Sequence, residues 1–122
     1  MKKTFTYAMD MNRINDAARA FARECGANVC TDKDLRYHAA AAREASAKAL
    51  GAYMAQWDEK GSTLSVTLPE FPSGWWWLRT ELEIITATSL LWQCGGAAAE
   101  RARLVMEATV ALIGEAVAHP QA

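Results

Sequence analysis

The sequence predicts an α+β fold that is mainly helical, with four helices packed against a two-stranded, antiparallel sheet. Two short segments alternate apolar and polar residues, as strands do, and four longer segments repeat apolar residues every three or four positions, as helices do. These segments follow one another in the order β-α-α-β-α-α. With 122 residues, 52% of them hydrophobic, the chain is long enough to bury a core of its own. We therefore expect a single domain over residues 1–122.

The first half of the chain predicts one strand and two helices. Residues 3–11 alternate, with one apolar side formed by Phe5, Tyr7, Met9 and Met11. Residues 13–25 then take a helical spacing. Thr31 followed by Asp34 has the form of a capping box, so a second helix is expected to run from there to about Asp58. A stripe of small residues on its inner face would let a neighbouring helix approach closely: Ala39, Ala42, Ala45 and Ala49.

The second half repeats the same plan. Residues 62–68 alternate again, and the prolines that follow end this strand. Two further helices are expected at about 75–94 and 97–118, separated by a pair of glycines. The halves 1–60 and 61–122 therefore share one order of elements. Divergent duplication and a chance resemblance of two alanine-rich halves both explain this order.

Charge and cysteine content limit the class of protein. The 13 basic and 14 acidic residues give a net charge of −1, so no overall field attracts nucleic acid or acidic lipids. No segment has the ~18 consecutive apolar residues that span a bilayer. The apolar stretch after Lys2 and Lys3 is too short for a signal peptide. Three cysteines without a framework spacing favour a reducing compartment. We expect a cytoplasmic protein without membrane association.

Three consecutive tryptophans give the clearest indication of function. Successive helix residues point about 100° apart, so three indoles cannot share one buried side of a helix. If the third helix starts near Trp75, Trp77 faces the core and the first two indoles face the polar side. Tryptophans beside charged residues have the composition of a protein–protein hot spot. The predicted partner-binding surface consists of Trp75, Trp76, Arg79, Glu83 and Leu90. The alternative is an irregular first turn that folds both indoles over the sheet.

The last helix predicts self-association. Its apolar residues cover roughly 200° of its circumference, against about 100° for an ordinary surface helix. Two stripes form this arc, and one contains Val105, Ala108, Leu112 and Ala116. The predicted contact with a second subunit uses the other stripe, formed by Met106, Val110, Ile113 and Val117. We therefore expect a homo-oligomer.

A small-ligand-binding protein or an enzyme, with a pocket at the third helix, is an alternative interpretation. Glu81 falls inside the apolar arc of this helix, where desolvation would raise the pKa of its carboxyl group. A pocket would then form around Glu81, Trp77 and Trp92. The simpler explanation is that Glu81 sits at an edge of the bundle and reaches a basic side chain.

Together these residues predict a non-enzymatic interaction or regulatory module that binds a protein partner. The sequence has no phosphate-binding loop, nucleophile elbow or paired-carboxylate motif, so neither a catalytic residue nor a cofactor is expected. Cys25 and Cys30 form one loose pair, less than a zinc site requires, so no metal is expected. A nucleic-acid-binding accessory factor is the other alternative, using Arg13, Arg19 and Arg23. A solvated helix face explains these arginines more simply, so nucleic acid is not the expected partner.

Overall fold

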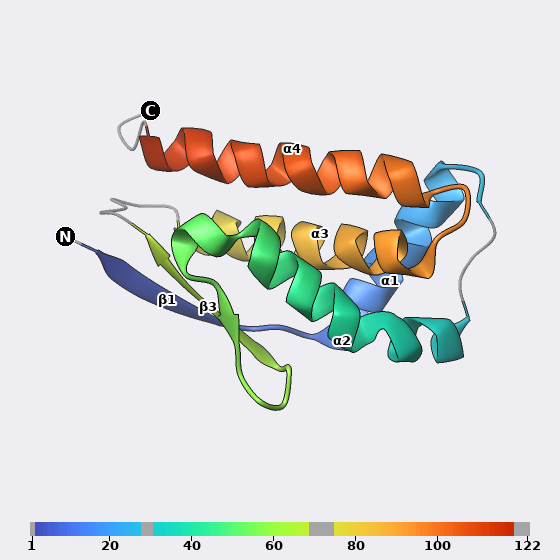
Figure 1. The fold of residues 1–122 in the computed structure, drawn as a ribbon, viewed down its shortest axis with the longest axis horizontal. Helices are drawn as coiled ribbons and strands as arrows, with labels where there is room; N and C mark the ends of the chain where they lie inside the picture. Colours follow the sequence, from blue (N-terminus) through green and yellow to red (C-terminus); the bar gives the residue numbers. More distant parts are fainter. Residues whose placement is uncertain (1, 28–30, 69–74, 119–122) are drawn as a thin grey trace.

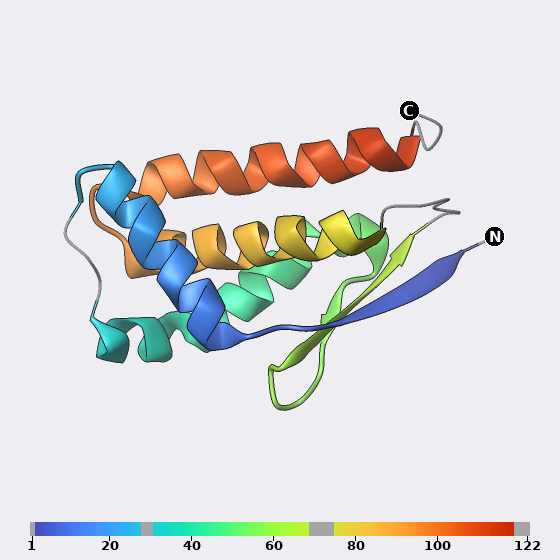
Figure 2. The same cartoon turned by 180° about the vertical axis from the view of Figure 1, so that it is seen from behind.

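A computed structural model of the chain describes residues 2–27, 31–68 and 75–118, and it confirms the α+β class with four helices. The elements follow in the order β1 (Lys3–Ala8), α1 (Met11–Glu24), α2 (Asp32–Ala49), the 3-10 turn η1 (Gly51–Tyr53), β2 (Gln56–Trp57), β3 (Thr63–Leu68), α3 (Trp75–Cys94) and α4 (Ala99–Ala118). Figure 1 shows α3 running through the middle of the molecule with α4 along one side. Figure 2, from behind, shows α1 crossing α3 on the face opposite α2.

The sheet has one strand more than the sequence predicts. Its strands are antiparallel in the order β1-β3-β2, and Lys3 lies opposite Leu68 in the β1–β3 register. One face turns to the core with the buried side chains of Tyr7, Leu64, Val66 and Leu68. The other face carries hydroxyl groups, which bond across the β1–β3 pair at 3.0 Å (Thr4 to Thr67) and 3.1 Å (Thr6 to Ser65).

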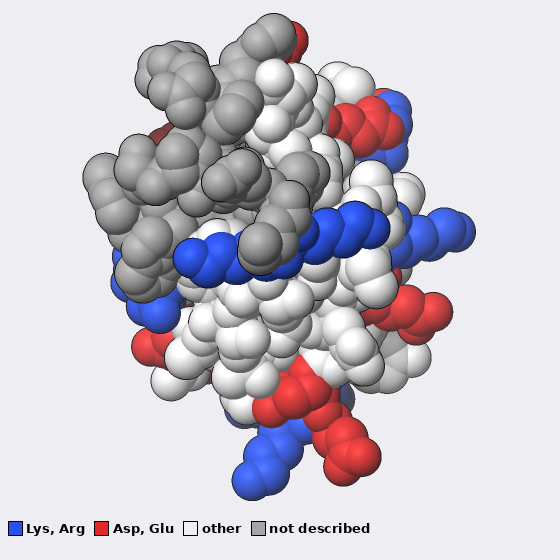
Figure 3. Space-filling view, turned by 90° about the vertical axis from the view of Figure 1, so that its left-hand side faces the viewer, with Lys and Arg blue, Asp and Glu red and all other residues white. Residues whose placement is uncertain are grey.

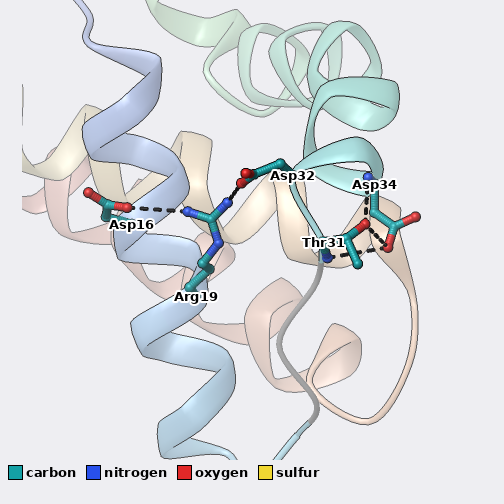
Figure 4. A network of polar contacts seen from close by, with 5 residues as sticks. All are labelled: Asp16, Arg19, Thr31, Asp32 and Asp34. Carbon is teal, nitrogen blue, oxygen red and sulfur yellow. Dashed lines mark hydrogen bonds and ion pairs between the residues drawn. The ribbon is translucent and has the colours of Figure 1, made fainter.

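The start of α2 is confirmed and is tied to α1. The backbone N–H of Asp34 donates to Oγ1 of Thr31 at 3.2 Å, and the Thr31 hydroxyl donates to the Asp34 carboxylate at 2.9 Å. Figure 4 shows Arg19 of α1 between two carboxylates. One belongs to Asp16 of its own helix, at 3.2 Å, and the other to Asp32 in the first turn of α2. The ion pair between Arg19 and Asp32 links the beginning of α2 to α1.

The end of α2 corrects the prediction. The helix stops at Ala49, whereas the sequence predicts its end near Asp58. Gly51 follows at once, and Met54 takes a left-handed φ of 53°, after which the chain turns back as β2. The apolar spacing continues because Trp57 still packs against the core, but from a strand rather than from a helix.

The core is organised around α3, which packs against α4, α2 and α1. All residues from 85 to 91 are buried, including its hydroxyl-bearing residues. The Thr86 hydroxyl donates to the carbonyl of Leu82 at 2.9 Å, and the Thr88 hydroxyl donates to that of Ile84 at 2.7 Å. A hydroxyl satisfied inside its own helix does not need water. The central helix is therefore α3, and α4 lies at the side.

Candidate protein-interaction site

The structure describes the side chains of three of the five residues predicted to form a tryptophan-bearing surface at the start of α3. The helix begins at Trp75 as predicted, but the side chains of Trp75 and Trp76 lie outside the described part of the chain. Arg79 is exposed. Leu90 is completely buried and Glu83 is 9% exposed, which corrects their assignment to a solvent-facing surface. Glu83 faces α1, and Leu90 lies two turns further along the same side of α3.

Two of the three arginines considered for nucleic-acid binding, Arg13 and Arg19, form ion pairs within the protein, and the third, Arg23, is exposed. Arg13 Nε lies 3.3 Å from Glu83 Oε2, and Arg19 is held between Asp16 and Asp32. Away from α1, on the side of the molecule where the N-terminus lies, Figure 3 shows basic and acidic side chains next to one another as well. A nucleic-acid phosphate would have to displace these carboxylates from the two arginines. The arrangement gives no support to the nucleic-acid alternative.

The stripe of α4 that was predicted to bind a second subunit turns toward the protein's own core. Met106 is 5% exposed and Ile113 is 1% exposed, while Val110 and Val117 are partly buried against the core. The Ser89 hydroxyl of α3 lies 3.0 Å from the Met106 sulfur. This stripe is the contact between α4 and α3. Met106 and Ile113 are therefore corrected from a subunit contact to an internal one.

The other side of α4 carries exposed apolar residues. Leu104 is 53% exposed and Leu112 is 59% exposed, and Ala108 and Ala111 beside them are exposed as well. Figures 1 and 2 both show α4 along one side of the molecule, with no other described element beyond it. One part of the wide apolar arc of α4 thus packs against α3, and the other part is exposed.

The pocket predicted around Glu81, Trp77 and Trp92 does not form as one cavity. Trp77 packs against the core near the start of α3, and Trp92 lies about four turns further along the helix. Trp92 lines a groove to which neither Glu81 nor Trp77 contributes. Glu81 itself is partly buried.

That groove is open, has a volume of about 600 Å³, and runs between α2 and α4 over the C-terminal end of α3. Its apolar surface combines alanines of α2 with larger residues of α3 and α4: Ala41, Ala45, Ala49, Trp92, Met106 and Val110. Polar groups along it come from Glu44, Lys48, Gln93 and Glu107. The feature of the sequence that pointed to this groove was the alanine spacing of α2. It predicted the close approach of another helix, but it did not show that part of this alanine surface would stay uncovered.

The cysteines do not assemble a site among the described residues. Cys25 and Cys94 lie partly buried near the ends of α1 and α3, and Cys30 lies outside the described residues. Across residues 2–27, 31–68 and 75–118, no group of three or more His, Cys, Asp or Glu side chains is placed to hold a metal ion. In the same ranges no helix combines the length and the apolar character needed to cross a membrane.

Comparison of the chain with protein-family models, with curated proteins and with solved structures finds no match. Its function has to be inferred from its own residues.

Proposed function

We propose that this protein is a non-enzymatic interaction module that binds an amphipathic helix of a partner protein in the groove between α2 and α4. The observation that carries the proposal is the groove, where both helices pack on α3 and leave apolar surface of Trp92 and Val110 between them, with the nearly buried Met106 also lining it. An amphipathic helix laid into such a groove buries its apolar side against both walls. The proposal keeps the function class expected from the sequence, a module that binds a protein partner. It replaces the predicted tryptophan surface at the start of α3 with a groove that Trp92 lines.

The α2 wall favours a helix as the occupant. Ala41, Ala45 and Ala49 follow one another every four residues along the groove, so their small side chains let a second backbone approach to about 8 Å. Between Ala41 and Ala49 the wall is about 12 Å long at 1.5 Å per residue, which corresponds to about two helical turns. A short helix with small residues on one side would therefore complete a bundle around α3.

Charged residues along the groove would set the orientation of a bound partner helix. Glu107 of α4 is already bonded to Arg103 at 2.6 Å. Glu44 and Lys48 of α2 are exposed beside the apolar surface, one turn apart and opposite in charge. A partner helix with the complementary order of charges would be held in one orientation, because reversing it would bring like charges together.

A small apolar ligand is the second candidate, favoured by the groove's volume. About 600 Å³ falls within the range of roughly 300–1,000 Å³ that is typical of small-molecule sites.

The proposed setting is a regulatory role in a reducing compartment such as the cytoplasm, since Cys25 and Cys94 are partly buried thiols.

Selection of displayed peptides on the full-length chain tests the proposal. A library of amphipathic helical peptides is selected on the wild type and counter-selected on Ala45→Arg, which fills the groove from the α2 wall. We expect enriched peptides with apolar residues at i, i+3, i+4 and i+7, and at least about tenfold weaker binding to Ala45→Arg. The matched control is Ala40→Arg, the same change at an exposed position of α2 that does not line the groove.

A fluorine label on the tryptophans reports where the peptide binds. In protein containing 5-fluorotryptophan, the Trp92 resonance, assigned with Trp92→Phe, is expected to shift when a selected peptide is added. If no enriched peptide depends on Ala45 and the Trp92 resonance does not respond, the proposal is wrong. If an apolar dye shifts this resonance and peptides do not, the small-ligand candidate replaces it.

A further inference from the structure

We infer that the exposed side of α4 pairs with α4 of a second copy of this chain, antiparallel and about a two-fold axis near Ala108. The inference is independent of the groove, which uses other residues of α4: Met106, Glu107 and Val110. Its success or failure therefore leaves the proposed function to be decided separately.

The pairing surface is a stripe that follows the outward side of α4. Its members are spaced by three or four residues, so they lie on one side of the helix. All of them are exposed: Arg101, Leu104, Ala108, Leu112 and Glu115. Both leucines are more than half exposed, and with Ala108 between them they form a continuous apolar strip, the kind of surface that marks an interaction site.

The stripe is symmetric about Ala108. Leu104 and Leu112 lie four residues to either side of Ala108, and Arg101 and Glu115 lie seven residues to either side with opposite charges. In an antiparallel two-fold pair, each residue meets the one equally distant on the other side of the axis. Leu104 then meets Leu112 of the second copy, and Arg101 meets Glu115 of the second copy. Each of these contacts occurs twice.

The charges favour the antiparallel orientation. A parallel pair would bring the two copies of Arg101 together, and likewise the two copies of Glu115, and would align the helix dipoles. The antiparallel pair replaces both repulsions with attractions. The neighbouring charges do not oppose it, since Arg103 is already bonded to Glu100 and Glu107 of its own helix. Ala108 at the axis allows the backbones to approach to the short end of the 8–10 Å range.

The size of the stripe indicates a reversible dimer. From Arg101 to Glu115 it is about 21 Å long and about one helix diameter, ~10 Å, wide. This is smaller than the roughly 800 Å² per partner of a standard interface. The dimer is therefore expected to form with rising concentration rather than to be permanent.

Sedimentation equilibrium of the full chain tests the inference, over concentrations from about 5 to 500 µM where a small interface is populated. We expect the wild-type mass to rise from monomer toward dimer. Ala108→Arg places two like charges at the axis and should remain monomeric throughout. Ala40→Arg, the same substitution at an exposed position of α2, should associate as the wild type does, and circular dichroism checks that both variants are folded.

A charge exchange tests the orientation. Arg101→Glu and Glu115→Arg each bring like charges together across an antiparallel pair, and each should weaken the dimer about tenfold. The double variant restores both attractions and should regain wild-type association. Parallel helices predict no such loss and recovery. A wild-type chain that stays monomeric at the highest concentration, or a double variant as weak as the single ones, overturns the inference.

Discussion

Arg13 of α1 and Glu83 of α3 form an ion pair, with 3.3 Å between Arg13 Nε and Glu83 Oε2. The two partners differ in exposure, since the arginine side chain is 66% exposed and the glutamate side chain is 11% exposed. The pair joins the first turn of α1 to the central helix. A carboxylate so little exposed depends on its partner more than a surface carboxylate does, because water cannot replace the lost arginine fully.

Arg13→Ala is therefore expected to lower the free energy of unfolding by about 1–2 kcal/mol, between the values for exposed and for buried pairs. Arg13→Lys keeps the charge and should cost less. Urea unfolding measures both, with Arg23→Ala as the control at an exposed position of the same helix. Equal stability of Arg13→Ala and Arg23→Ala would contradict the expectation.

The Ser46 hydroxyl links α2 to β2. The Trp57 indole N–H donates to Ser46 Oγ at 3.2 Å, and the Ser46 hydroxyl donates to the carbonyl of Arg43 at 2.8 Å. Ser46 is completely buried. Ser46→Ala should cost about 1–3 kcal/mol of stability, because the partly buried indole N–H loses its acceptor. Trp57→Phe removes the donor, so the double variant should cost less than the sum of the two single changes. Additive costs in a thermodynamic cycle would show that the bond contributes nothing.

The Asp58 carboxylate organises the turn between β2 and β3. It accepts hydrogen bonds from the backbone N–H groups of Ser62 at 2.7 Å and Thr63 at 3.0 Å. These bonds lower the pKa of Asp58 to about 2. Because this folded-state pKa lies below the unfolded value of about 4, the stabilisation is complete above pH 4 and is lost as the pH falls toward 2. Asp58→Asn should be less stable at neutral pH and should show a weaker dependence on pH between 4 and 2. Urea unfolding midpoints of both proteins, measured across this pH range, check the prediction. Midpoints that fall equally with pH in the wild type and in Asp58→Asn would refute it.

Tyr7 is expected to titrate late. It is 1% exposed, and burial raises its pKa to about 12, with the nearby positive charge of Arg79 partly opposing the shift. Since this value lies above the unfolded value of about 10, its contribution to stability is present below pH 10 and is lost as the pH rises from 10 to 12. At most, this contribution is about 2–3 kcal/mol.

An ultraviolet difference titration checks the shift directly. One of the three tyrosines should ionise well after the others in the wild type, and this late phase should be missing in Tyr7→Phe. A late phase that persists in Tyr7→Phe would assign it to another tyrosine.

Local patterns in the sequence predicted the elements well because their causes are local. The capping box at Thr31 and the alternation in residues 63–68 each involve neighbours in the chain. The end of α2 was missed because apolar spacing continues through Trp57, and spacing alone does not distinguish a helix from a turn followed by a strand. Gly51 was the available signal.

The choice of α3 as the central helix could not be made from the sequence, because both α3 and α4 have wide apolar arcs. A helical wheel treats Thr86 and Glu83 as polar residues and therefore assigns them to the solvent-facing side of the helix. In the fold, Thr86 is satisfied by the carbonyl of Leu82 and Glu83 by an arginine of another helix. The groove was missed for a related reason, since its walls on α2 and α4 are far apart in the chain.

The register of β1 has a consequence for synthesis on the ribosome. Lys3 pairs with Leu68, and in the described residues β1 has no other strand beside it. The residues of β1, α1 and α2 are therefore synthesised before β3 has emerged to pair with β1. Bringing Lys3 beside Leu68 closes a long loop, and the contacts of the β1–β3 pair have to offset the entropic cost of that closure. In the nascent chain, β1 therefore stays without its pairing strand until Leu68 has been translated.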